Sequence, residues 1–143
     1  MFFDEEMLLD LRLNIMNKYV DKFIITEATY MHNGKPKELI FDINKFSKFK
    51  DKIIYKVVDK PPPDLKIIND SDSQEMKDSK KHSNAYKRHI YQLEETQKET
   101  SNADGDDVII VSDLDEIPNL EKVNFNKINE KLIFFEQKMF YYK

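Results

Sequence analysis

Short apolar runs that alternate with segments of helical periodicity are the feature that most constrains this fold. Runs rich in β-branched residues predict strands at 20–28, 52–59 and 108–112. Apolar residues at helical spacing predict helices at 4–19, 42–49 and 80–99. Strands that are separated by helices usually lie parallel in one sheet, with helices on both faces. We therefore expect an α/β fold with a mainly parallel sheet, formed as one domain over residues 1–143.

The periodicity also predicts which side chains face the core. The first helix is expected to bury Leu8, Leu11 and Ile15, and the third helix Tyr86, Ile90 and Leu93. The polar, proline-containing segment 60–79 is expected to be a long loop. A weak helix is expected over 119–130, followed by one or two strands in the aromatic-rich segment 131–142. Aromatic side chains left exposed there would favour oligomer formation.

Composition excludes several classes of site and partner. The chain has no cysteine, which rules out disulfides and thiolate metal sites. No apolar run approaches the roughly 20 residues of a membrane helix, and no signal segment is present, so we expect a cytoplasmic protein. The net charge of -4 provides no general attraction to nucleic acid or to an anionic membrane.

Three acids follow the apolar run 108–112 directly: Asp113, Asp115 and Glu116. In a parallel sheet, ligands bind at the carboxyl ends of the strands. The polar segments 26–35 and 57–63 follow the other two predicted strands at the same positions. The sequence therefore predicts that three polar loops meet at one edge of the sheet.

The spacing of Asp113 and Asp115 suits one hard cation. Residues two apart in extended backbone point to the same side, with Cα atoms about 6–7 Å apart. Oxygen ligands favour Mg²⁺ or Mn²⁺, which complete their coordination with substrate phosphates. The same D-x-D pattern occurs in polar loops at 70–72 and 104–106, where we interpret it as solvated. A capped turn between strand and helix would explain Asp113 and Asp115 equally well, and their spacing leaves both interpretations open.

Four segments of the chain together resemble glycosyltransferase family 17. They read FFDEEMLLDLRL, VDKFIITEATYMHNGKPKEL, DDVIIVSDLDEIP and FFEQKMFYYK, in the order of the family. That family includes the β-1,4-mannosyl-glycoprotein N-acetylglucosaminyltransferases. The resemblance implies a Rossmann-like fold of the GT-A type, and a reaction that inverts the anomeric carbon of a sugar supplied by a UDP-sugar, UDP-GlcNAc in the known animal enzymes. Family sequences continue beyond MFYYK, so this chain is expected to represent the donor-binding half.

The resemblance also assigns expected roles to individual residues. Asp113 and Asp115 match the D-x-D motif that holds Mn²⁺ or Mg²⁺ against the donor, and Glu116 is a candidate general base by position. Residues expected to contact the donor are Glu27, Gly34, Lys35, Lys37, Asn84, Arg88 and Asp113. Of these, Arg88 matches the middle of a family triplet that here reads KRH, and Asn84 lies one turn earlier on the same helix face.

We therefore expect a metal-dependent glycosyltransferase whose partners are a nucleotide-sugar donor and a glycan acceptor. The alternative from a different class is a non-catalytic module that binds sugar nucleotides or glycans. A phosphotransferase or nucleotidyltransferase would use Asp113 and Asp115 in the same way, but the flanking segments favour the glycosyltransferase.

Overall fold

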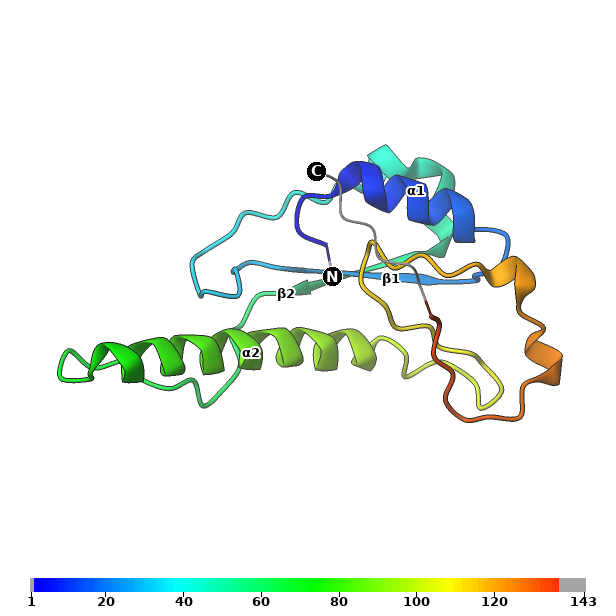
Figure 1. Cartoon of the computed structure of the whole chain (residues 1–143). Helices are drawn as coiled ribbons and strands as arrows, with labels where there is room; N and C mark the ends of the chain where they lie inside the picture. Colours follow the sequence, from blue (N-terminus) through cyan, green and yellow to red (C-terminus); the bar gives the residue numbers. More distant parts are fainter. Residues whose placement is uncertain (1, 137–143) are drawn as a thin grey trace, which may run out of the picture.

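The computed structural model describes residues 2–136 and contains a small parallel sheet between two layers of helices (Figure 1). Strands β1 (Phe23–Ala28) and β2 (Ile53–Val58) pair in parallel from Phe23 with Ile53 to Ala28 with Val58. The strands predicted at 20–28 and 52–59 are confirmed, and so are their parallel arrangement and the α/β class. Because the strands are parallel, the loops that follow them leave from the same end of the sheet.

One face of the sheet is covered by α1 (Glu6–Met16) and by the 3₁₀ helix η1 (Ile43–Lys52), as Figure 1 shows. Alternate residues of a strand point to opposite faces, so one set of β1 side chains faces this layer. The shared core contains Phe2, Leu9, Leu13, Met16, Phe23, Ile25, Phe46, Phe49 and Leu120. The buried apolar side chains of α1 and η1 therefore pack in one core with those of β1.

The long helix α2 (Gln74–Lys98) lies along the opposite face (Figure 1). The hydroxyls of Thr26 and Thr96 are 2.7 Å apart, which joins β1 to α2. Lys56 of β2 forms ion pairs with Glu95 at 3.7 Å and Glu99 at 2.8 Å. Helices on both faces explain why β1 is buried without a strict alternation of apolar and polar residues.

The apolar stripe predicted for the first helix is wrong at two of its three residues, and the third, Leu8, is half-buried. Leu11 and Ile15 are 50% and 45% exposed, whereas Leu9, Leu13 and Met16 are buried. Both sets recur at intervals of three and four residues, so helical periodicity fits either of them. Packing against β1 and η1 selects the second set.

Helix α2 begins at Gln74, six residues before the predicted start. The Ser73 hydroxyl accepts a hydrogen bond from the Met76 amide at 3.2 Å, as an N-cap residue does. Its predicted apolar face is also only partly right, because Tyr86 is 63% exposed and Asn84 is buried. Met76 is the one apolar residue of the first two turns, so periodicity could not identify them as helix.

The predicted strand at 108–112 is wrong. In the structure this segment is irregular, and Val108, Ile109 and Val111 are more than half exposed. Ile110 instead packs against the core beside α1, as do Leu114 and Ile117. A continuous apolar run does not distinguish a buried strand from an extended segment that packs through a few side chains.

The final part of the described chain contains two short 3₁₀ helices, η2 (Leu120–Lys122) and η3 (Phe125–Lys127), in place of the predicted helix at 119–130. Residues 131–136 form no strand, and the rest of the strand prediction, at 137–142, lies outside the described residues. Across residues 2–136 no helix combines the length and the apolar character needed to cross a membrane.

Candidate functional site

The acidic segment 112–117 forms a turn that is held from within. The Glu116 amide donates to the Asp113 carbonyl at 3.1 Å, and the Ile117 amide donates to the Asp115 carbonyl at 3.2 Å. One carboxylate oxygen of Glu116 accepts the Asp113 amide at 3.1 Å. The Glu116 side chain thus closes the turn, but no strand precedes the turn and no helix directly follows it, so it is not the capped strand-to-helix turn that the spacing allowed.

Arg12 of α1 holds this turn from outside. Its Nη1 donates to the carbonyl oxygens of Asp113 at 2.8 Å and Glu116 at 2.9 Å, with a longer contact of 3.3 Å to that of Leu114. Its Nη2 donates to the Ser112 hydroxyl at 2.5 Å. Sequence reasoning missed Arg12, although a charged residue inside the apolar segment LRL was an available signal.

The carboxylates of Asp113 and Asp115 are ligands of the kind that a hard cation takes, although this segment is a turn and not the extended backbone assumed for their spacing. Both residues are exposed, and within residues 2–136 their carboxylate oxygens accept no hydrogen bond and form no ion pair. This donor set contains oxygen only, as Mg²⁺ and Mn²⁺ prefer. No third acid or histidine of the described residues gathers with them into a metal-binding group. A cation at this turn would therefore take its remaining ligands from substrate or water.

Glu27, at the end of β1, is fully buried and surrounded by donors. Its carboxylate accepts hydrogen bonds from the Ile40 amide at 2.9 Å, the Phe41 amide at 3.1 Å and the Tyr55 hydroxyl at 2.7 Å, and it forms an ion pair with Lys37. These contacts join β1 and β2 to the segment before η1. Both carboxylate oxygens are therefore already hydrogen-bonded to other groups of the protein. The contact of Glu27 with the nucleotide-sugar stays a prediction.

The same contacts control protonation in this cluster. Burial raises the pKa of Glu27, but the hydrogen bonds from Lys37, Ile40, Tyr55 and Phe41 outweigh it, so the net pKa lies below the ordinary value. Burial and the adjacent Glu27 carboxylate both raise the pKa of Tyr55. Glu27 is therefore a carboxylate, and Tyr55 a neutral donor, at neutral pH.

The predicted loop at Gly34 is a tight turn covered by α2. The Gly34 amide donates to the Met31 carbonyl at 2.8 Å, and Gly34 has a φ of +88°, a conformation that glycine adopts easily. Arg88 reaches across from α2 and donates to the His32 carbonyl at 3.0 Å. The structure thus brings together Gly34 and Arg88, which the resemblance matched to two different segments of the family. Lys35 is exposed at the edge of the same turn.

Replacing Gly34 by alanine is expected to lower the free energy of unfolding by about 1–2 kcal/mol. The positive φ is unfavourable for alanine, and the added Cβ would lie 2.7 Å from Arg88 Nη2, so that this side chain has to move. The matched control is Gly105→Ala, whose Cβ meets nothing within 4 Å, and whose effect should stay within about 0.5 kcal/mol. Urea denaturation measures both variants, and equal effects would contradict the role of this turn.

Asn84 has a different partner from the one predicted with Arg88. Its side-chain amide donates to the Lys66 carbonyl and accepts from the Lys66 amide, both at 2.8 Å. Asn84 is buried, and these bonds fasten the loop between β2 and α2 to the helix. The donor contact predicted for Asn84 stays a prediction, because both of its polar groups already have partners.

The predicted site residues form two groups in the structure. Glu27 joins Lys37, and Gly34 joins Arg88, near the carboxyl ends of β1 and β2. The acidic turn is attached to α1 through Arg12. Among residues 2–136, no hydrogen bond or ion pair connects the acidic turn with the first group.

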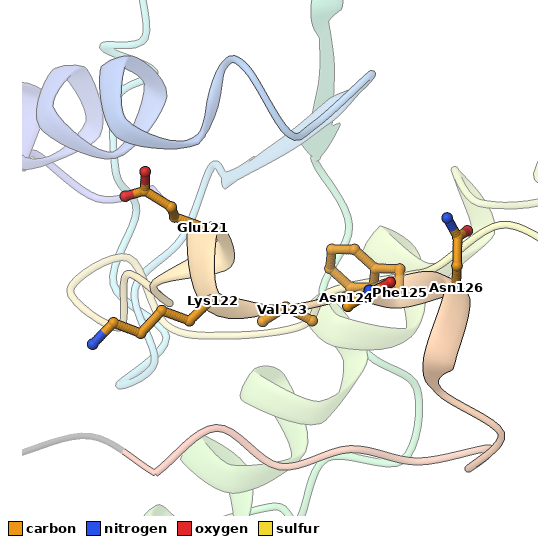
Figure 2. Close-up of a pocket in the computed structure, with 6 residues that line it drawn as sticks. All are labelled: Glu121, Lys122, Val123, Asn124, Phe125 and Asn126. Atoms are coloured by element: carbon orange, nitrogen blue, oxygen red, sulfur yellow. The ribbon is translucent and has the colours of Figure 1, made fainter.

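Among residues 2–136, two surface hollows lie near elements discussed above. Figure 2 shows the first, of about 520 Å³, which is lined by six consecutive residues, Glu121 to Asn126, around η2 and η3. The second, of about 510 Å³, lies beside Phe41 and Tyr55, next to the Glu27 cluster. Neither contains Asp113 or Asp115. We therefore define the candidate site by the acidic turn and its free carboxylates, which do not require an enclosed cavity.

Comparison with known proteins identifies one family. The family model described as Glycosyltransferase family 17 matches residues 1–143, which is the whole chain. The comparisons with curated proteins and with solved structures give no match. The match includes both strands, the Gly34 turn and the acidic turn.

Proposed function

The chain belongs to glycosyltransferase family 17, and from this membership we propose that it transfers a sugar from a UDP-sugar to a glycan acceptor with inversion at the anomeric carbon. N-acetylglucosamine is the proposed sugar, and a GT-A arrangement is the proposed fold. The match over residues 1–143 is the observation that carries the proposal. The exposure of the two carboxylates of the acidic turn, which have no partner within residues 2–136, supports it further.

Asp113 and Asp115 are the proposed ligands of Mn²⁺ or Mg²⁺. Their carboxylates have no partner within residues 2–136, and their backbone is fixed by Arg12 and Glu116. When bound, the cation would neutralise charge on the donor diphosphate. The protein contributes two carboxylates on a turn whose backbone is already held by hydrogen bonds.

Glu116 is the proposed general base. An acceptor hydroxyl would form a bond to the anomeric carbon while the bond from that carbon to the diphosphate breaks, and the hydroxyl proton would pass to a carboxylate. One oxygen of Glu116 is held by the Asp113 amide at 3.1 Å. This contact keeps the carboxylate beside the proposed donor site and leaves its other oxygen to accept a proton.

Gly34, Lys35 and Arg88 are proposed to contact the donor from the other group of residues. Lys35 is exposed, and Arg88 carries a guanidinium, which suits phosphate oxygens through its planar fork. Glu27 and Lys37 support this region from within through their ion pair. Asn84 contributes by holding the neighbouring loop against α2.

The proposal is tested by titrating UDP-GlcNAc into the protein with and without Mn²⁺. The double variant Asp113→Asn/Asp115→Asn is expected to lose at least about 100-fold in Mn²⁺-dependent affinity, because each charged contact contributes about 1.5–3 kcal/mol. The matched control is Asp104→Asn/Asp106→Asn, which makes the same change in a second, exposed D-x-D pattern. The control should bind like the wild type.

UDP release in the presence of a glycan acceptor then distinguishes an enzyme from a binding module. Metal-dependent binding with turnover supports the glycosyltransferase. Metal-dependent binding without turnover would favour a non-catalytic sugar-nucleotide module. Binding that is unaffected by Mn²⁺, or by the loss of both carboxylates, would refute the proposed donor site.

A further inference from the structure

Arg12 uses its guanidinium for backbone oxygens and not for the carboxylates beside it. Three of its four contacts in the acidic turn are to the carbonyls of Asp113, Leu114 and Glu116, and the fourth is to the Ser112 hydroxyl. No ion pair joins Arg12 to a carboxylate within residues 2–136. An arginine that paired with Asp113 or Asp115 would compete with a cation for them. Arg12 leaves both carboxylates free.

The position of Arg12 is set by the core. Leu9 and Leu13 of α1 are 2% and 1% exposed, so the register of the helix against the sheet is fixed by packing. Leu114 and Ile117, from the turn itself, pack against the same core. Arg12 therefore lies on a helix fixed by packing and reaches a turn about 100 residues away in the sequence. That turn is itself fixed to the core by Leu114 and Ile117.

The charge of Arg12 acts on the same turn. Burial lowers the pKa of Arg12, while the neighbouring Glu116, Asp113 and Asp115 oppose that shift. Arginine nevertheless stays protonated in proteins at neutral pH. A fixed positive charge beside three acids reduces their mutual repulsion, which would otherwise favour opening of the turn.

We propose that Arg12 is the positioning residue of the donor site, holding the backbone of the acidic turn so that Asp113 and Asp115 present their carboxylates to the same cation. This inference rests on the proposed function. Arg12 acts through the turn and contacts neither the donor nor the metal. The planar fork matters because it serves two places at once: Nη1 donates to the carbonyls of Asp113 and Glu116, while Nη2, held at a fixed distance from it, donates to the Ser112 hydroxyl.

The test measures the affinity for Mn²⁺ alone, by electron paramagnetic resonance of the free ion, in Arg12→Gln, Arg12→Lys and the wild type. Supporting residues of this kind typically change metal affinity 10- to 100-fold, and we expect a loss in that range for Arg12→Gln. Arg12→Lys keeps the charge but loses the fork, so it should recover part of the affinity and remain about tenfold weaker.

The matched control is Lys48→Gln, which removes a positive charge that contacts a different part of α1. Lys48 donates to the Asn14 side chain at 2.8 Å, so Lys48→Gln changes charge and helix contacts without touching the acidic turn. Its Mn²⁺ affinity should equal that of the wild type. Amide hydrogen exchange at Asp113 and Glu116 reports the turn directly, and both amides should exchange faster in Arg12→Gln but not in Lys48→Gln.

The outcomes separate this inference from the proposed function. Wild-type affinity for Mn²⁺ in Arg12→Gln would overturn the positioning role and leave the proposed function intact. No Mn²⁺ binding by the wild type would overturn the proposed function and the positioning role together. If Arg12→Gln fails to fold, Arg12→Lys decides, and an affinity equal to that of the wild type would show that the charge suffices and that the fork is not needed.

Discussion

Replacing Glu27 by glutamine is expected to lower the free energy of unfolding by about 3–5 kcal/mol, the usual cost of removing one partner from a buried ion pair. Glu27 is 0% exposed, and the side chain of Lys37 is only 9% exposed. Glutamine leaves the ammonium of Lys37 without a counter-charge and cannot accept from all four donors. Chemical denaturation measures the loss, and Glu38→Gln, on an exposed neighbour, should change stability by less than about 0.5 kcal/mol.

A double variant identifies the origin of the cost. Glu27→Gln/Lys37→Met removes the unpaired ammonium and should recover part of the lost stability, as coupled neighbours do in a double-mutant cycle. The pH dependence provides a second check. Because the folded pKa of Glu27 is lowered from its ordinary value of 4.5, its contribution is fully present above that pH and is lost as the pH falls further. In Glu27→Gln the stability should no longer fall for this reason at acid pH. The same loss of stability at acid pH in the variant and the wild type would show that Glu27 is not its source.

Replacing Leu13 by alanine is expected to lower the free energy of unfolding by about 2–5 kcal/mol, the range for truncating a buried leucine. Leu13 is 1% exposed and lies in the core shared by α1, β1 and η1. Leu11, on the same helix, is 50% exposed and provides a control with the same chemical change. Leu11→Ala should cost less than about 1 kcal/mol, because it removes little area from the core.

Thermal unfolding followed by circular dichroism measures this pair of variants. The apolar stripe predicted from periodicity contains Leu11, and the stripe observed in the structure contains Leu13. Greater destabilisation by Leu11→Ala would therefore indicate that α1 packs with the face that contains Leu11, and not Leu13, against the core. That packing would also move Arg12 away from the acidic turn, so this comparison bears on the positioning role as well.

The local part of the fold could be predicted from the sequence. Strands β1 and β2 have β-branched runs bounded by polar segments, and the turn at Gly34 has the Asn-Gly pair that such turns favour. The segment 108–112 has the same composition as a strand but is irregular in the structure. Strand formation needs a hydrogen-bonding neighbour, and composition does not reveal whether one is available.

The candidate site was predictable only in part, for the same reason. Asp113 and Asp115 were found from their spacing, and both are exposed without partners within residues 2–136. Arg12 was not found, because its partners are carbonyl oxygens about 100 residues away, and every residue has a carbonyl. The type of residue that is contacted therefore gives no information about such a contact.

By itself, the sequence determined the elements from the first helix to α2, the absence of cysteine chemistry and the two carboxylates of the acidic turn. Only the tertiary structure decided that α1 buries Leu13 and not Leu11, that Glu27 is enclosed by four donors, and that Arg12 holds the turn. The physical reason is that periodicity and spacing are properties of one segment. Burial and hydrogen bonding also depend on which distant segment packs against it.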